Sequence, residues 1–178
     1  TIGADPEFAI SYRRHFVRAD NFLSGYNSEI GVDGNSSIGE FRPKPGNASF
    51  VAAEVRRLIS ECKGELGPNH NIVGGSYFTY PLGGHIHISG RGHSIEPRLL
   101  RALNKFIAKP LNQISNASAR RSRGYGQLSS YRTQPHGWEY RSPASWISHP
   151  TLTKGVLSIA YWLTQRNEDQ LQKITDNK

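Results

Sequence analysis

Residues 83–90 read Gly-Gly-His-Ile-His-Ile-Ser-Gly, and the regular alternation of polar and apolar side chains predicts a β-strand. Successive side chains of a strand point to opposite faces of its sheet, so His85 and His87 share one face while Ile86 and Ile88 share the other. Three other segments alternate in the same way and carry ionisable groups two residues apart. They are residues 4–10 with Asp5 and Glu7, residues 38–43 with Glu40 and Arg42, and residues 136–142 with Glu139 and Arg141.

If these segments share one sheet, their carboxylates, imidazoles and guanidinium groups gather on one face, and helices are expected to cover the apolar face. An ordinary antiparallel sheet with one solvated face alternates too. Such a face usually carries Thr, Ser, Lys and Gln, however. Short acids and histidines beside arginines, flanked by glycines, are more typical of a functional site.

Three helices are expected. A cap at Asn47 or Ser49, followed by apolar residues at helical spacing, predicts a helix that Gly64 stops. Pro97 opens a second helix, and Pro110 is expected to kink or end it. A third helix starts near residue 150. The sequence therefore predicts strands and helices in one domain, with the helices packed on the apolar face of the sheet.

The connections are predicted from glycine, proline and polar residues. Residues 71–81 are expected to form a strand paired with residues 83–90. Residues 20–37 and 119–130 are expected to form loops, and the polar tail after residue 165 is expected to be frayed.

The length of 178 residues suits a single domain (1–178) with a sizeable core. No apolar run approaches the roughly 18 residues that cross a bilayer, so no membrane partner is expected. A single cysteine, Cys62, excludes an intramolecular disulfide and fits the cytoplasm. The chain has no methionine and starts on a predicted strand, so we expect trimmed termini.

The net charge of +8 favours an anionic partner, either a nucleic acid, ATP or an acidic substrate. A basic segment interleaves arginines with tyrosines: Arg120, Arg121, Arg123 and Arg132 with Tyr125 and Tyr131. We interpret it as a triphosphate clamp, with a nucleic-acid contact as the alternative. For Arg120 and Arg121 a plain solvated loop is the other interpretation.

The acids and histidines of the polar face suit Mg²⁺ or Mn²⁺, because oxygen ligands outnumber imidazoles. A catalytic zinc site would be richer in histidine. Either His85 or His87 could instead form only a hydrogen bond within the sheet. His93 and His136 are expected to lie at the periphery of the site.

Four motifs resemble, in order and spacing, the phage-type COOH-NH2 ligases, or amidoligases, of the glutamine synthetase-like superfamily. The motifs are GADPEF (3–8), GVDGNSSIGEFRPKPG (31–46), GGHIHIS (83–89) and YRTQPHGWEYRSPASW (131–146). The resemblance covers about 140 residues. It implies an α+β fold like the glutamine synthetase catalytic domain, with a curved, mostly antiparallel sheet, helices packed on one face, and a concave face that holds ATP and metal ions. For a phage-encoded chain it implies a location in the host cytoplasm.

Site roles follow from the resemblance. It implies the metal ligands Asp5, Glu7, Glu40, His85 and Glu139, and the nucleotide contacts Arg42, Arg123, Arg132, Arg141 and His87. Arg132, Arg141 and Glu139 are the expected catalytic residues. Many superfamily members carry glutamate where this chain has Asp5, and the shorter side chain could keep Asp5 out of direct metal contact.

The implied reaction is ATP-dependent. A carboxylate takes the γ-phosphoryl group of ATP to become an acyl phosphate, and an amine then attacks to form an amide. The substrates would be small-molecule or peptide carboxylates and amines. The sequence leaves open whether the chain forms a homo-oligomer in which a neighbouring subunit completes the site. No GxxxxGK[ST] sequence is present, which excludes a P-loop enzyme. The alternatives are a metal-dependent hydrolase, such as a phosphoesterase or amidase, and a basic nucleic-acid-binding module.

Overall fold

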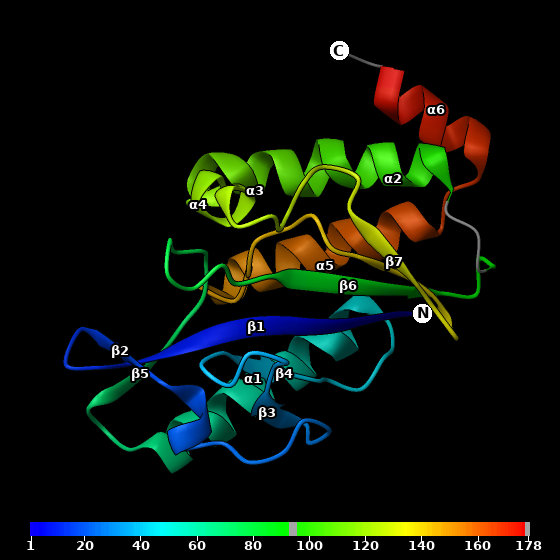
Figure 1. Cartoon of the computed structure of the whole chain (residues 1–178). Helices are drawn as coiled ribbons and strands as arrows, with labels where there is room; N and C mark the ends of the chain where they lie inside the picture. The colour runs from blue at the N-terminus through cyan, green and yellow to red at the C-terminus, as the bar shows by residue number, and fades with distance from the viewer. Residues whose placement is uncertain (93–95, 177–178) are drawn as a thin grey trace.

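Figure 1 shows the computed structural model of the chain, which describes residues 1–92 and 96–176. The long strand β1 (Ile2–Tyr12) lies in the middle of the sheet. Within the described residues the sheet has eight strands and runs in the order β3-β4-β1-β6-β8-β7, while β2 and β5 pair with the second half of β1. All of these pairs are antiparallel, which confirms the predicted α+β class.

The other strands are short: β2 (His15–Val17), β3 (Ile30–Val32), β4 (Gly39–Phe41), β5 (His70–Val73), β6 (Gly84–Ser89), β7 (Tyr131–Gln134) and β8 (Gly137–Tyr140). The helical segments are η1 (Ala19–Asn21), α1 (Ala48–Leu66), α2 (Pro97–Leu103), η2 (Asn104–Ala108), α3 (Lys109–Ile114), α4 (Ala117–Ser122), α5 (Pro150–Thr164) and α6 (Glu168–Asp176).

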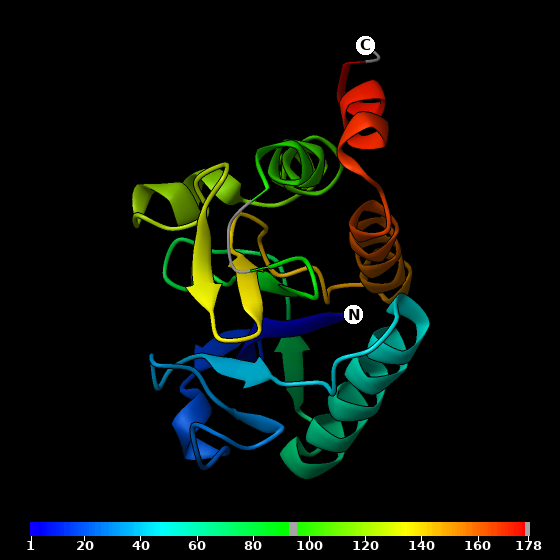
Figure 2. The same ribbon diagram turned by 90° about the vertical axis from the view of Figure 1, so that its right-hand side faces the viewer.

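The apolar face of the sheet packs against helices, as predicted. Figure 2 shows α1 and α5 side by side along this face. The sheet contributes fully buried side chains from four neighbouring strands: Ile2, Phe8, Phe41, Ile86, Ile88, Trp138 and Tyr140. Apolar residues at helical spacing meet them from α1, α2 and α5, among them Val51, Val55, Leu58, Leu99, Leu103, Val156 and Leu163. This core leaves the opposite face of the same strands for polar side chains.

Two predicted helix boundaries need correction. The side chain of Asn47 caps α1 by accepting a hydrogen bond from the N–H of Phe50, as expected. The helix passes through Gly64, however, and ends before Gly67, whose φ of +80° suits glycine. Pro110 does not end its helix either. The π-turn η2 precedes it, with the N–H of Lys109 donating to the carbonyl of Asn104, and the helix continues through α3.

The predicted pairing of residues 71–81 with residues 83–90 is wrong. Strand β5 ends at Val73 and pairs with β1, whereas the neighbours of β6 are β1 and β8. Gly75, with a φ of +90°, breaks the strand and forms a single bridge to Ser145. Six further elements of the described residues were not predicted. β2, η1 and β3 lie between residues 15 and 32, so the expected loop of residues 20–37 contains a strand. The others are α4 in the basic segment, β7 before β8, and α6 in the C-terminal tail.

Among the described helices, none is both long and apolar enough to span a membrane. Cys62 is buried in α1 and is a free thiol.

Gly39 provides a test of the sheet packing. A Cβ atom at this position would lie 2.3 Å from Cζ of Phe8, the cross-strand partner of Gly39. We expect Gly39→Ala to lower the free energy of unfolding by about 1–3 kcal/mol, since the ring stacked on Phe41 has to move. Gly155→Ala in α5 is the control, because nothing lies within 4 Å of its added Cβ. It should stabilise the protein by about 0.5–1 kcal/mol in denaturant titrations. Equal effects of the two substitutions would contradict this packing.

Candidate functional site

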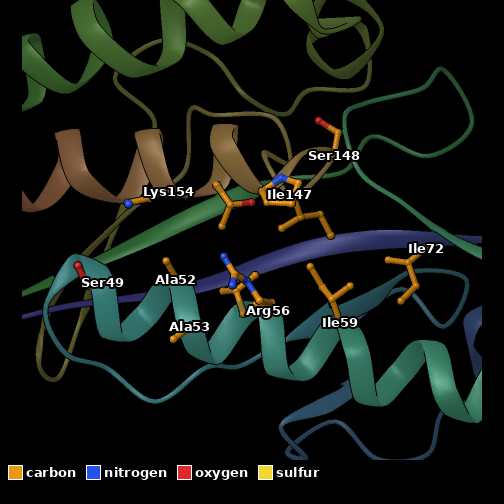
Figure 3. A pocket seen from close by; sticks show the side chains of 12 residues that line it. Ser49, Ala52, Ala53, Arg56, Ile59, Ile72, Ile147, Ser148 and Lys154 are labelled. Carbon is orange, nitrogen blue, oxygen red and sulfur yellow. The ribbon is translucent and has the colours of Figure 1, made fainter.

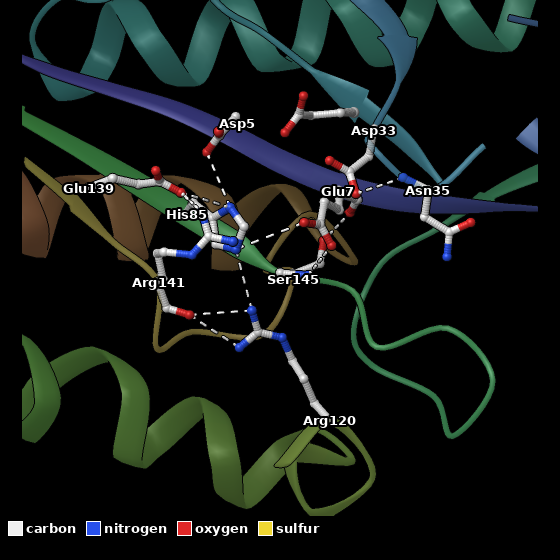
Figure 4. A network of polar contacts seen from close by, with 12 residues as sticks. Asp5, Glu7, Asp33, Asn35, His85, Arg120, Glu139, Arg141 and Ser145 are labelled. Atoms are coloured by element: carbon white, nitrogen blue, oxygen red, sulfur yellow. Dashed lines mark hydrogen bonds and ion pairs between the residues drawn. The ribbon is translucent and has the colours of Figure 1, made fainter. Parts of the chain in front are cut away.

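The sheet register brings the four predicted polar pairs together on neighbouring strands. Across β4, β1, β6 and β8 the register aligns Glu7 with Glu40, Asp5 with His85, and His87 with Glu139. Figure 4 shows several of these side chains converging, and dashed lines join His85 to carboxylates from different strands. The predicted polar face therefore exists and its groups are in contact.

One group of ligand atoms, called cluster 1, consists of Asp5, His87 and Glu139. Each residue offers an atom within 4.8 Å of the others, which is close enough to share a metal ion. Nε2 of His87 lies 3.1 Å from Oδ2 of Asp5. The other oxygen of Asp5, Oδ1, is buried, and none of the described residues forms a hydrogen bond with it. A bound cation would satisfy that oxygen, so the donor set fits a metal ion.

A second group, cluster 2, consists of Glu7, Asp33 and Glu40, again with ligand atoms within 4.8 Å of one another. Oε2 of Glu7 accepts a hydrogen bond of 2.6 Å from the backbone N–H of Gly83, and Glu40 forms an ion pair with Arg42. The ligand set is made only of carboxylates, which suits hard cations. In the part of the chain that the structure describes, clusters 1 and 2 are the two groups of this kind.

Asp33 was absent from the sequence prediction. It lies directly after β3, whose residue Gly31 is aligned with Glu40 on β4. The signal was its place in the GVDGN stretch, seven residues before Glu40, in a segment interpreted only as a loop. The local pattern does not predict the contact between Asp33 and the other acids of cluster 2, because the contact forms only when the turn between β3 and β4 brings the aspartate back to the sheet.

His85 lies between the two clusters. Nδ1 is 3.2 Å from Oε1 of Glu139 and 3.6 Å from Oδ1 of Asp5, while Nε2 is 3.8 Å from Oε1 of Glu7. The ring is 3% exposed. Burial and the nearby Arg141 and Arg120 guanidinium groups lower the pKa of His85 well below its usual value, so the imidazole is neutral. A neutral ring can serve as a metal ligand or a hydrogen-bond partner.

Glu139 organises the predicted arginines. Its side chain is fully buried; Oε2 lies 2.7 Å from Nη2 of Arg132, and Oε1 lies 2.6 Å from Nη1 of Arg141. Gln134 donates a further hydrogen bond of 2.8 Å to Oε2. Pairing offsets the cost of burying this carboxylate. Arg42, the remaining predicted strand arginine, pairs with Glu40 and donates to the carbonyls of Ser28 and Val32.

Arg120 is a buried part of the site and not a solvated loop residue. Only 3% of it is exposed, and its guanidinium donates to the carbonyls of Arg141 and Ser142. Nη2 also lies 3.3 Å from Nε2 of His85 (Figure 4). Burial lowers the pKa of Arg120 to about 10, so the group stays cationic at neutral pH. Only the formation of α4, which the sequence analysis missed, brings Arg120 to the sheet.

A cavity of about 520 Å³ opens beside cluster 2, and its volume is in the range of small-molecule sites. The lining combines acids of the clusters with the basic segment: Glu7, Asp33, His85, Arg120, Arg123, Tyr125 and Arg141. A second hollow of about 460 Å³ lies between α1 and α5 on the opposite face and is lined by Ala52, Ile59 and Ile147 among others (Figure 3). Its lining contains no predicted site residue, in contrast to the lining of the first cavity.

The remaining histidine predictions have mixed outcomes. His136 is exposed at the edge of cluster 1, as expected, and its Nε2 lies 3.0 Å from Nδ1 of His87. This contact orients the ring of His87 in cluster 1. His93 lies outside the described residues.

Three carboxyl groups of the site, those of Asp5, Glu7 and Glu40, have raised pKa values. Burial, reinforced by neighbouring acids, raises the pKa of Glu7 to about 7 and that of Glu40 to about 8. Burial also raises the pKa of Asp5, although the hydrogen bond with His87 opposes this. Burial alone would lower the pKa of His87, but the same bond and the charges of Asp5 and Glu139 raise it. The ionised forms of these carboxyl groups are thus poorly compensated by the protein itself, and a bound cation would stabilise them.

Raised carboxyl pKa values give a testable pH dependence. Glu7 and Glu40 contribute to the stability of the folded state when they are protonated. This contribution is fully present below their ordinary pKa of 4.5 and is lost as the pH rises through about 7 to 8. Glu40→Gln mimics the protonated form. In chelating buffer, the melting temperature of the variant should therefore rise relative to that of the wild type as the pH increases from about 5 to about 9. Added Mg²⁺ or Mn²⁺ should stabilise the wild type more than the variant.

The control is Glu61→Gln, on the exposed surface of α1, which should follow the wild type at each pH and with each metal. A constant difference in melting temperature between Glu40→Gln and the wild type would contradict the raised pKa of Glu40.

Comparison with known proteins identifies the family of the chain. A family model described as phage phiEco32-like COOH.NH2 ligase-type 2 matches residues 2–178. Among curated individual proteins, no match was found. The match confirms the resemblance seen in the sequence motifs and extends it over nearly the whole chain. The chain therefore belongs to the phage phiEco32-like COOH·NH2 ligases of type 2, a family named for the joining of a carboxylate to an amine.

Proposed function

We propose that the protein is an ATP-dependent carboxylate-amine ligase that uses Mg²⁺ or Mn²⁺ and forms its amide through an acyl phosphate. The observation that carries this proposal is the pair of metal-binding clusters on one sheet face, beside a cavity lined by arginines. A carboxylate is a poor electrophile, so direct attack by an amine is slow. Transfer of the γ-phosphoryl group to a carboxylate oxygen gives an acyl phosphate and ADP. The amine then attacks the carbonyl carbon and phosphate leaves.

Clusters 1 and 2 supply the ligands for the metal ions in this proposal, with His85 within reach of both. Metal ions held by these residues would supply positive charge that neutralises the phosphate groups. The five carboxylates Asp5, Glu7, Asp33, Glu40 and Glu139 outnumber the two histidines, which favours Mg²⁺ or Mn²⁺ over zinc. Direct participation of Asp5 is supported by its unpartnered oxygen.

The arginines are proposed to bind the phosphate groups. Arg123 and Arg141 line the cavity, and their guanidinium groups can each form two parallel hydrogen bonds with a phosphate. Arg132 and Arg42 are held beside the clusters by Glu139 and Glu40. Their charge is thus fixed before the nucleotide arrives, which lowers the cost of binding it.

This use of the basic residues also argues against a nucleic-acid-binding module. Such a module presents its arginines as an exposed stripe. Here Arg120 is buried and Arg132 and Arg141 pair with a buried carboxylate. The guanidinium groups of these arginines therefore face the acids of the site.

Glu139→Gln tests the metal requirement. Glutamine keeps the shape of the side chain but loses the charge that cluster 1 needs. We expect metal-dependent ATP binding, measured by calorimetry with Mg²⁺ or Mn²⁺, to weaken by at least about tenfold. Glu61→Gln, far from the clusters, should bind like the wild type. If neither metal promotes ATP binding by the wild-type protein, the proposed function is wrong.

Arg141→Lys tests the phosphate contact. Lysine keeps the positive charge but cannot form two parallel hydrogen bonds. The affinity for ATP should fall about tenfold, since a hydrogen bond to a charged group contributes about 1.5–3 kcal/mol. Metal affinity measured without nucleotide should change much less. Arg56→Lys on α1, on the other side of the sheet, is the control. An unchanged nucleotide affinity in Arg141→Lys would remove Arg141 from the phosphate site.

A further inference from the structure

The cavity beside cluster 2 has a buried polar floor and an exposed aromatic rim. Glu7 and His85 on its floor are 8% and 3% exposed. At the rim, Tyr125 is 53% exposed and lines the cavity, and Phe78, 63% exposed, contacts the lining residue Arg123. Single exposed aromatics need no explanation. Two at the rim of one cavity, with an arginine beside them, suggest a binding role.

Tyr125 is held rigidly at this rim. It lies between Gly124 and Gly126, which have φ values of +83° and +68°. The N–H of Tyr125 donates a hydrogen bond of 3.2 Å to the carbonyl of Arg120. A Cβ atom on Gly126 would lie 2.1 Å from Nη1 of Arg120, so only glycine lets the loop pack onto the buried guanidinium. The ring therefore projects from a backbone that is fixed to the floor of the site.

Phe78 belongs to a tight turn from the opposite wall. The backbones of Tyr77 and Tyr80 exchange two hydrogen bonds, of 2.8 and 3.2 Å, and this places Phe78 and Thr79 at the tip. Thr79 lines the cavity. The guanidinium carbon of Arg123 lies 5.7 Å from the centre of the Phe78 ring. Figures 1 and 2 both show the segment between β5 and β6 beside α4 at the same end of the sheet.

A planar, weakly polar ligand group suits this rim. Aromatic side chains bind nucleobases by stacking, and an arginine adds cation–π attraction. The floor, in contrast, offers cations and metal ligands that suit phosphates. We propose that Phe78 and Tyr125, together with Arg123, form the base subsite of a nucleoside triphosphate whose phosphate groups lie toward clusters 1 and 2. This inference rests on the proposed function, because it assumes that a nucleotide binds in this cavity.

The test compares ATP with inorganic tripolyphosphate, which has the phosphates but no base. Calorimetric affinities are measured with Mg²⁺ for the wild type, Phe78→Ala and Tyr125→Ala. Each substitution should weaken ATP binding about tenfold, the scale of one base-stacking contact, and leave tripolyphosphate binding unchanged. Tyr125→Phe keeps the ring and should keep the affinity for ATP.

Trp162→Ala is the matched control. Trp162 is also an exposed aromatic, 44% exposed, with the guanidinium carbon of Arg166 at 4.3 Å, but it lies on α5 outside the cavity. Its ATP affinity should equal that of the wild type.

The outcomes separate the two proposals. Wild-type protein that binds neither ATP nor tripolyphosphate overturns the proposed function, and the base subsite with it. Wild-type protein that binds ATP, with unchanged affinity in Phe78→Ala and Tyr125→Ala, overturns the base subsite alone. Equal losses for ATP and tripolyphosphate also overturn it, since the aromatic rings would then act on the phosphates and not on the base.

Discussion

Strand β1 lies in the middle of the sheet and carries both Asp5 and Glu7, so these carboxylates lose most of their contact with water when the sheet forms. Burying a charged group is costly unless it is paired or neutralised. The surrounding structure supplies part of the compensation through the backbone N–H of Gly83 and the ring of His87. The raised pKa of Glu7 and the unpartnered oxygen of Asp5 indicate that the compensation is incomplete without a cation. The proposed metal binding would thus be linked to protein stability through the same strand.

The acids of the site differ in how their charge is balanced. Glu139 is fully buried, but Arg132 and Arg141 hold both of its oxygens. Glu40 pairs with Arg42, yet burial and the neighbouring acids still raise its pKa to about 8. Perturbed carboxyls of this kind concentrate at functional sites because ordinary packing gives no reason to keep them. The carboxyl groups whose charge is poorly balanced lie beside the arginine-lined cavity. Metal ions that bind there with a phosphate ligand would supply the missing positive charge.

Much of the sheet and its polar face could be predicted from the sequence, because both depend on a strict local rule. Side chains two residues apart share a face, so the pairs that contain His85 and Glu139 could be recognised without knowing their neighbours. The residues 71–81 show where this reasoning fails. Their apolar and aromatic residues satisfy strand propensity, yet Gly75 turns the chain away, and the segment instead forms one wall of the cavity.

The sequence by itself determined the α+β class, the apolar face that helices cover, the polar pairs and the family motifs, since each is encoded within a few consecutive residues. Tertiary structure alone decided which pairs became neighbours and which distant groups joined them. Asp33 enters cluster 2 through the turn between β3 and β4, and Arg120 reaches His85 through a short helix. The physical reason is that strand register and chain reversal depend on packing of the whole core, which no local pattern specifies.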